Sequence, residues 1–278
     1  MKKRSIYLIL LAAVTIAAIC FGTYVHAGRP VFNFSKGNFS VMFGSEGTHE
    51  THKKITEFSS VDIDLKNADV SFKTGDGYSL TYMGLEKNFP SCKVENDVLS
   101  VRDPAGKKPK GILQVTLPQS FKDITVNTDN GDIIFDTDQE ITVDTIDLES
   151  DNGDIIVKSG KNLTVTTAKT DCENGDTVIV GWQGSSLTAS SKNGDIGATQ
   201  VGFDEIDAKS DNGDIGITTS DKLSSYTFHL TGGNGDISIG DGIYSGTLSK
   251  NSEITVGEGQ KSMRLVSKNG DVKVRGSK

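Results

Sequence analysis

The sequence repeats a short pattern of apolar and polar positions around the tripeptide Asn-Gly-Asp. Mostly apolar residues precede its Asn by six and by four positions, and others follow it by three and by five, with polar residues between them. The residue two positions before the Asn is small in every copy. This alternation on both sides of a turn predicts two short strands that share one buried face. The seven copies begin at Asn130, Asn152, Asn174, Asn193, Asn212, Asn234 and Asn269.

The spacing of the copies indicates how these strands are arranged. Successive Asn residues are 22, 22, 19, 19, 22 and 35 positions apart, a repeat length that is typical of units that stack to bury one another. Two related segments extend the series: Asn67-Ala68-Asp69, and Asn251-Ser252-Glu253, which would divide the long gap. Asn and Gly both tolerate positive φ, so we expect them to form a tight reversal, with each Asp capping amides of its own turn.

Two all-β architectures satisfy the pattern. In a single-stack β-solenoid, each period of about 20 residues forms one coil, and equivalent strands stack in parallel. In an antiparallel β-meander or sandwich, each Asn-Gly would be a hairpin tip. The small residue before the turn favours the solenoid, because the inside corner of a coil has little room.

The same reading divides the chain into four parts. We expect regular solenoid repeats over 122–278, a degenerate N-terminal β region over 56–121, and a juxtamembrane linker over 28–55. Residues 1–27 are expected to be a membrane anchor or a signal peptide. The last coil, Val272–Val274, is expected to be an exposed edge that the charges of Lys273 and Arg275 protect from strand addition.

The N-terminal segment predicts where the rest of the chain resides. Three basic residues, Lys2, Lys3 and Arg4, precede an apolar run, and positive residues favour the cytoplasmic side of a membrane. A retained helix over Ile6–Val25 would span the hydrocarbon layer and tether an extracytoplasmic domain to the cytoplasmic membrane. Alternatively, cleavage near Ala27 would release a secreted protein. Cys20 does not indicate a lipoprotein, because Ile19 stands where a small residue is needed.

Composition excludes several classes. Among the 278 residues, 29 Lys and Arg stand against 37 Asp and Glu, which gives a net charge of −8, so a nucleic-acid partner is not expected. Three cysteines are too few for a disulfide framework. Without residues 1–27, which hold three basic and no acidic residues, the net charge becomes −11. A domain with this charge is repelled by anionic lipid or wall polymer unless cations bridge them.

The repeated acidic residue is the candidate metal site. In a solenoid these carboxylates would form a ladder, and calcium prefers clustered carboxylate oxygens. We favour a structural role, with calcium binding as the alternative. The ladder consists of Asp132, Asp154, Asp176, Asp195, Asp214, Asp236 and Asp271, and Asp69 and Glu253 would extend it.

Other reactive side chains have simpler interpretations. Cys172 occupies the small position, so it is interpreted as a buried equivalent of Ser, although a bridge to Cys92 is an alternative. His49 and His52, near Glu46 and Glu50, are expected to be solvated rather than to bind a metal. His229 falls at an outward-facing position. No catalytic group and no cofactor is predicted.

Further motifs carry a family resemblance. Val115–Pro118 (Val-Thr-Leu-Pro), Ile124–Ile133 and the repeated Ser-x-Asn-Gly-Asp-Ile resemble the bacterial putative-adhesin domain family of unknown function, including LiaG-like envelope proteins. The resemblance covers roughly Thr56 to Val274. It implies an exported, often membrane-anchored β-repeat protein, and it defines no catalytic residues. Some LiaG-like members of the family accompany envelope-stress signalling systems.

Three functions therefore remain open. The leading hypothesis is a non-catalytic envelope protein, an adhesin or stress accessory, whose partner is a cell-wall polymer or an envelope protein. The second is cation-dependent binding of wall polymer through the stacked acidic turns. The third is a carbohydrate-active β-helix enzyme, which the even distribution of acids and the few Arg residues disfavour.

Overall fold

The computed structural model describes residues 30–35, 38–43, 49–107 and 109–276, and the chain divides into two compact units, Met1–Thr48 and His49–Lys278. In the first unit, β1 (Pro30–Ser35) and β2 (Asn38–Phe43) pair as an antiparallel hairpin. The expected anchor or signal peptide, residues 1–27, lies outside the described residues. Within the described ranges, no helix has the length and apolar character needed to cross a membrane.

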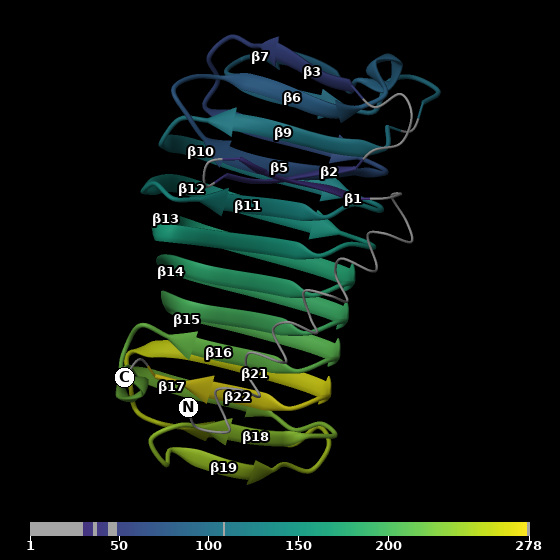
Figure 1. Ribbon diagram of the computed structural model, residues 1–278. Helices are drawn as coiled ribbons and strands as arrows, with labels where there is room; N and C mark the ends of the chain where they lie inside the picture. The colour runs from purple at the N-terminus through teal and green to yellow at the C-terminus, as the bar shows by residue number, and fades with distance from the viewer. Residues whose placement is uncertain (1–29, 36–37, 44–48, 108, 277–278) are drawn as a thin grey trace. The chain divides into compact units, whose positions relative to one another are not determined.

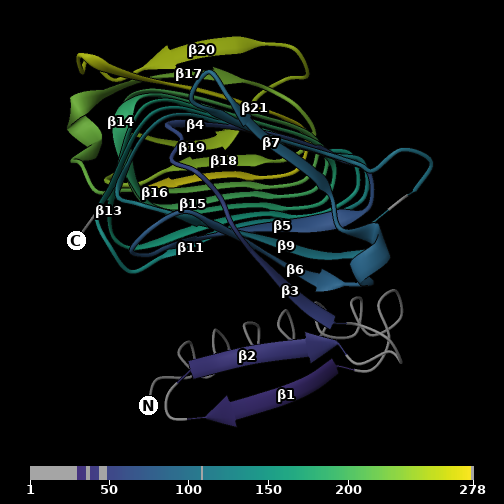
Figure 2. The same cartoon turned by 90° about the horizontal axis from the view of Figure 1, so that it is seen from above.

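The second unit is a stack of coils with two sheet faces, shown from the side in Figure 1 and along the stack in Figure 2. A regular coil has one strand on the first face, an Asn-Gly-Asp corner, and one strand on the second face. Three long strands also continue through the opposite corner, from the second face to the first: β13 (Ile155–Asn174), β14 (Thr177–Asn193) and β15 (Ile196–Asn212). The expectation of an all-β, solenoid-like fold with parallel strands is confirmed.

The order of strands across the first face follows from their pairing. From the N-terminal end of the stack it contains β7 (Ser91–Glu95), β8 (Val98–Arg102), β4 (Ser60–Leu65), β10 (Ser120–Thr128), β12 (Ile141–Ser150), the second halves of β13, β14 and β15, β21 (Lys261–Asn269), β17 (Tyr226–Thr231) and β20 (Glu253–Val256).

The second face has the matching order. It contains β3 (His49–Lys54), β6 (Ser79–Gly84), β9 (Gly111–Leu117), β5 (Ala68–Thr74), β11 (Ile133–Thr137), the first halves of β13, β14 and β15, β16 (Ile215–Thr219), β22 (Val272–Arg275), β18 (Asp236–Ile239) and β19 (Tyr244–Thr247). Two short 3-10 helices, η1 (Glu86–Asn88) and η2 (Leu223–Ser225), lie in the connections.

The core lies between the two faces and is made by the alternating apolar positions. Equivalent residues stack directly on one another: Ile146 pairs with Ile124 on one side and with Ala168 on the other. These side chains are fully buried, as is Trp182, the largest side chain in the core. Burying an Ile or Leu side chain stabilises a fold by about 1.5–3 kcal/mol, so the stacked columns supply the main stabilisation. The parallel register excludes a meander for these coils.

The coils do not follow one another in sequence order at either end. The C-terminal coil, β21–β22, lies between the coil of β15 and β16 and the coil of β17 and β18, as the yellow strands in Figure 1 show. At the N-terminal end, β4–β5 likewise lies between β8–β9 and β10–β11. The expectation that the last coil is an exposed edge was therefore wrong.

Antiparallel strands close both ends of the stack. At the N-terminal end β7 pairs antiparallel with β8, and β6 and β3 follow β9 in the same manner. At the C-terminal end β20 pairs with β17, and β19 with β18. The sequence predicted a stacked corner at Asn251-Ser252-Glu253, and this prediction was wrong. Asn251 and Ser252 lead into the antiparallel end strand β20, which starts at Glu253. Residues 56–121 belong to the same stack as 122–276, and 28–55 contains β1, β2 and β3.

Candidate functional site

The Asn residues of the corners form one continuous hydrogen-bonded ladder. From Asn130 onward, each Nδ2 group donates to Oδ1 of the Asn in the neighbouring coil, over 2.7–3.3 Å, so that the ladder begins at Oδ1 of Asn67 and ends at Asn269 and Asn234. In five of these Asn side chains, Nδ2 donates a second bond to the backbone carbonyl that precedes the neighbouring Asn. Both amide hydrogens are then used, so these side chains hold the stack and have no donor left for a ligand.

Glycine is required at the corner by contact between coils. A Cβ atom built on Gly153 would lie 2.2 Å from the carbonyl oxygen of Gly131, and one on Gly175 would lie 2.4 Å from that of Gly153. The glycines of six of the seven corners do not have positive φ. The prediction that Gly provides left-handed backbone was therefore wrong, because parallel coils pass through the corner too closely for a side chain.

In five of the seven corners, the small residue before the turn also bonds to the neighbouring coil. The hydroxyl of Ser150 donates to the carbonyl of Gly131 over 3.0 Å, and Ser210 and Ser267 make the equivalent bond at 3.1 and 3.0 Å. The thiol of Cys172 does the same to Gly153 over 3.1 Å. Cys172 is thus the buried equivalent of Ser that the sequence suggests.

The Asp ladder is also structural, although each carboxylate acts on a neighbouring corner. Oδ1 of Asp69 accepts the backbone N–H of Asp132, and the same bond, over 2.8–3.0 Å, continues through the stack. The structure brings together all seven predicted residues, Asp132, Asp154, Asp176, Asp195, Asp214, Asp236 and Asp271. Glu253 lies in β20, outside the ladder. The expectation that each Asp caps its own turn was wrong.

Burial changes the acidity of the ladder at its N-terminal end. The pKa of Asp69 is raised to about 6, chiefly by burial and further by the neighbouring Asp132 carboxylate, whereas the hydrogen bond from the Asp132 amide lowers it. Burial also raises the pKa of Asp132 and of Asp154, although each carboxylate accepts a backbone N–H from the next Asp of the ladder, which lowers the pKa. Across the described part of the chain, no group of three or more His, Cys, Asp or Glu is placed to hold a metal ion.

Of the remaining predicted residues that the structure describes, His52 and Glu50 are brought together and the two cysteines are not bonded to each other. Among the described residues, Cys92 and Cys172 are both free thiols, so the alternative of a bridge between them was wrong. His52 contacts Thr81 Oγ1 through Nδ1 at 2.9 Å and Glu50 Oε1 through Nε2 at 3.4 Å. Glu46 lies outside the described residues.

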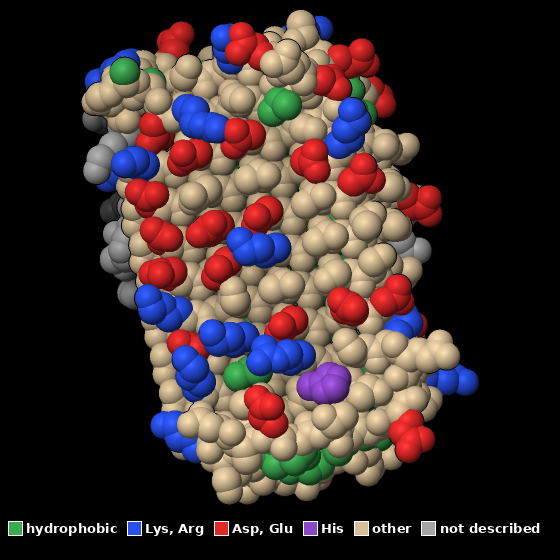
Figure 3. All heavy atoms as spheres, turned by 180° about the vertical axis from the view of Figure 1, so that it is seen from behind, with side chains coloured by type: hydrophobic (Ala, Val, Ile, Leu, Met, Phe, Trp, Pro, Cys, Tyr) green, Lys and Arg blue, Asp and Glu red, His purple; other side chains and the backbone are tan. Residues whose placement is uncertain are grey.

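The outer surface of the first face carries two columns of polar residues, which are exposed or half-buried. One column runs through Asp62, Thr125, Asp147, Lys169, Thr188, Asp207, Arg264 and His229, and the other through Asp64, Asn127, Glu149, Asp171, Ser190 and Lys209. Figure 3 shows this face, with acidic side chains and several basic ones over its upper part, acidic ones in the middle, and a further group of basic ones lower down. Ion pairs such as Lys169–Asp147 at 3.2 Å link successive coils. The face is a broad polar surface with an acidic N-terminal half.

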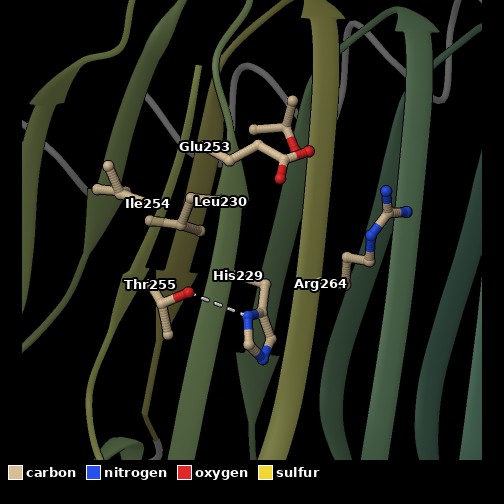
Figure 4. A pocket seen from close by; sticks show the side chains of 7 residues that line it. His229, Leu230, Glu253, Ile254, Thr255 and Arg264 are labelled. Carbon is tan, nitrogen blue, oxygen red and sulfur yellow. Dashed lines mark hydrogen bonds between the residues drawn. The ribbon is translucent and has the colours of Figure 1, made fainter. Parts of the chain in front are cut away.

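A hollow lies near the C-terminal end of this face, where β20 pairs with β17. It has a volume of about 260 Å³ and is lined by His229, Leu230, Thr231, Glu253, Ile254, Thr255 and Arg264 (Figure 4). His229 Nδ1 lies 3.2 Å from Thr255 Oγ1, and Arg264 Nη1 lies 3.6 Å from Asp207 Oδ2. The imidazole of His229 therefore already contacts a hydroxyl, and the guanidinium of Arg264 already contacts a carboxylate.

A polar cluster that the sequence did not indicate holds the inserted C-terminal coil. Nζ of Lys261, at the start of β21, lies 2.9 Å from Asp221 Oδ2 and 3.3 Å from Asp204 Oδ1. The buried Tyr226 hydroxyl lies 2.8 Å from Asp221 Oδ2 and 3.0 Å from the carbonyl oxygen of Phe203. Burial alone would raise the pKa of Asp221, but the hydrogen bonds from Lys261 and Tyr226 outweigh it, and the pKa is lowered. These residues lie outside the repeat, so no periodic signal marks them.

Comparison with known proteins agrees with this architecture. The chain is similar to a putative adhesin of Bacteroides fragilis NCTC 9343, with 17% identity, 84% of this chain and 98% of that chain covered, and a TM-score of 0.52. Putative adhesins of Parabacteroides merdae and Parabacteroides distasonis are 14% and 13% identical, cover 83% and 82% of this chain and 97% and 98% of theirs, and give TM-scores of 0.47 and 0.45. No curated protein matches the sequence. The family model described as Toastrack DUF4097 matches residues 58–275, and the chain therefore belongs to that family.

Proposed function

We propose that this chain is a non-catalytic protein of the bacterial cell envelope, which presents the faces of its β-solenoid as a binding surface in adhesion or in an envelope-stress accessory role of the LiaG-like kind. One observation carries the proposal. The Asn, Ser and Asp side chains of the corners are engaged in bonds between coils, whereas the outer columns of the first face turn exposed or half-buried polar side chains toward solvent. What the repeat offers to a partner is therefore the face and not the corner.

The proposed location rests on the N-terminal sequence. We infer that the apolar run over Ile6–Val25 anchors the chain in the cytoplasmic membrane, with the Toastrack domain outside, and that cleavage near Ala27 is the alternative. Intact-mass measurement of the mature protein distinguishes the two, because cleavage removes 27 residues. Protease added to intact spheroplasts should then degrade the domain if it lies outside the membrane.

Binding assays with a matched pair of variants test the surface role. The full chain is immobilised and exposed to isolated cell-wall polymer and to a solubilised envelope-protein fraction. Neutralising the acidic columns with D64N, E149Q and D171N should reduce the retention of envelope proteins whose basic groups pair with these carboxylates. The control D136N, D138N and E140Q removes three exposed acids elsewhere and should not reduce it. Retention that is equal in the two variants, or no greater than on an empty support, would contradict the proposal.

Two further arms separate the other hypotheses. Wall polymer retained only with calcium, and released by a chelator, would support cation-dependent binding through the acidic residues. Release of reducing ends or unsaturated sugars from defined polysaccharides would indicate an enzyme. We expect no such release, because the proposal assigns no acid–base pair to the protein.

A further inference from the structure

The two ends of the stack differ in the charge of their edge strands. At the N-terminal end, β3 carries His49, Glu50, His52, Lys53 and Lys54 among its six residues, and β7 carries Lys93 and Glu95. At the C-terminal end, β19 has the sequence Tyr-Ser-Gly-Thr, without a charge, and β20 has only Glu253. Charged side chains on an edge strand are a usual protection against strand addition. The N-terminal end is therefore protected, and the C-terminal end is not.

The unprotected end combines backbone edges with apolar side chains. Among the described strands, β19 pairs only with β18 and β20 only with β17, so one side of each strand has no partner strand. Ile243, Tyr244, Leu248, Ile254 and Val256 pack against the core there and stay partly exposed. Figure 1 shows β19 at this extremity, and Figure 3 shows hydrophobic side chains at the same end.

The number and placement of the edges favour a second copy of this chain as the partner. The two edges have four residues each and lie at one end, one on each face. An extended peptide would cover one of them, whereas a second copy related by a two-fold axis normal to the faces would cover both, strand against the same strand, in antiparallel direction. Both sheets would then continue from one molecule into the other.

Charge also favours this end for self-association. Copies with a net charge of −8 repel one another, and the repulsion is weakest where edge strands that carry only Glu253 meet. In an antiparallel pair, two facing residues point to the same side of the sheet. When a strand pairs with its own copy, the two-fold axis therefore passes through a residue and not between two residues. With β20 centred on Ile254 or Thr255, Glu253 faces Thr255 or Gly257 of the mate, and no two carboxylates are opposed. We propose that β19 and β20 form the interface of a tail-to-tail dimer, in which each strand pairs with the same strand of a second copy.

Site-specific cross-linking of the full chain tests the dimer. S245C on β19 and T255C on β20 place exposed thiols beside the proposed axis, and T188C places one in the middle of the first face as the control. A short bis-maleimide spans both registers, since facing and diagonal Cβ atoms across such a pair are about 4.5–8 Å apart. We expect several-fold more dimer from S245C and T255C than from T188C or from the parent chain with its native cysteines.

A charge introduced on the other strand tests whether both edges pair at once. T247K adds a charge to β19, and in the T255C background it should lower the β20 cross-link several-fold, whereas T188K should not. Thermal unfolding verifies that each variant is folded. Cross-linking no greater than in T188C, an adduct whose mass is not twice that of the chain, or a T255C cross-link that T247K leaves unchanged would each overturn the proposal. The outcome is independent of which molecule the faces bind.

Discussion

Oδ1 of Asp154 accepts a hydrogen bond from the backbone N–H of Asp176, over 2.9 Å, in the coil that stacks on its own. In the Asn and Ser columns, too, the donor lies in one coil and the acceptor lies in the coil beside it. The repeated side chains of a corner therefore act mainly on the neighbouring coil. A substitution in one corner therefore affects two coils, and its effect depends on which coil lies beside it.

Two glycine substitutions should show whether a corner needs Gly because the coils lie close together there or because the backbone of Gly is flexible. In G175A the new Cβ would lie 2.4 Å from the carbonyl oxygen of Gly153, so either the corner opens or the bonds around it lengthen. We expect a loss of about 2–4 kcal/mol in the free energy of unfolding, measured by chemical denaturation. In the control G216A the Cβ meets nothing within 4 Å, and we expect no loss or a gain of about 0.4–1 kcal/mol. Equal effects of the two substitutions would contradict the role assigned to the corner glycine.

Asp69 should make the domain less stable as the pH rises through mild acid. Its pKa in the folded chain is about 6, above the ordinary value of 3.8, so the folded state binds the proton more tightly than the unfolded state. Stability from this group is therefore present below about pH 4 and is lost as the pH rises through 6, by up to about 2–3 kcal/mol.

The variant D69N isolates this contribution. Its amide oxygen can still accept the N–H of Asp132, but it does not ionise, so D69N should melt at a higher temperature than the parent at pH 7 and at a similar one at pH 4. D236N, at the exposed end of the ladder, serves as the control. A difference between D69N and parent that does not change with pH would show that the ionisation of Asp69 is not the cause.

Cys172 should tolerate Ser and resist thiol reagents. Ser occupies the equivalent position in four other corners, and its hydroxyl can replace the thiol bond to Gly153. Burial, together with the Asp154, Asp176 and Asp171 carboxylates, raises the pKa of Cys172 to about 12, so little thiolate is present at neutral pH.

Peptide mass spectrometry after alkylation of the native chain measures this reactivity. Cys172 should remain unmodified while the half-buried Cys92 reacts, and C172S should unfold within about 1 kcal/mol of the parent. Rapid alkylation of Cys172 in the folded chain would mean that this corner opens.

Lys261 should hold the inserted coil in place. K261M keeps the aliphatic stem but removes the charge that pairs with Asp221 and Asp204, leaving the partly buried Asp221 with only the Tyr226 hydroxyl. We expect a loss of about 1–3 kcal/mol, with faster hydrogen exchange concentrated in β21 and β22. The control K273M lies on the same coil and is exposed. If both variants exchange alike, the ion pairs of Lys261 do not fix the coil.

The sequence was informative where the structure is periodic. Positions such as Ile146 and Ser150 repeat their environment from coil to coil, so spacing alone predicts strands, buried face and small corner residues. The insertion of β21–β22 was not predictable, because Asn269 fits next to Asn212 as well as Asn234 does, and one repeat looks like another. The sequence does not distinguish an Asp that caps its own turn from an Asp that accepts an N–H of the neighbouring coil, because both arrangements use the same residue types.

The order in which the chain is made has a consequence for its folding. Residues 261–275 are synthesised after residues 196–239, yet they fill a position between two coils formed by residues 196–219 and 226–239. Until they arrive, β15 and β16 have no neighbour on one side, and β17 and β18 lack the strands that join them to the stack. A prematurely terminated chain would therefore expose long, ready-made strand edges, which favour aggregation and degradation. The inserted coil thus makes the C-terminal part of the stack dependent on residues that are made later than the coils on both sides of it.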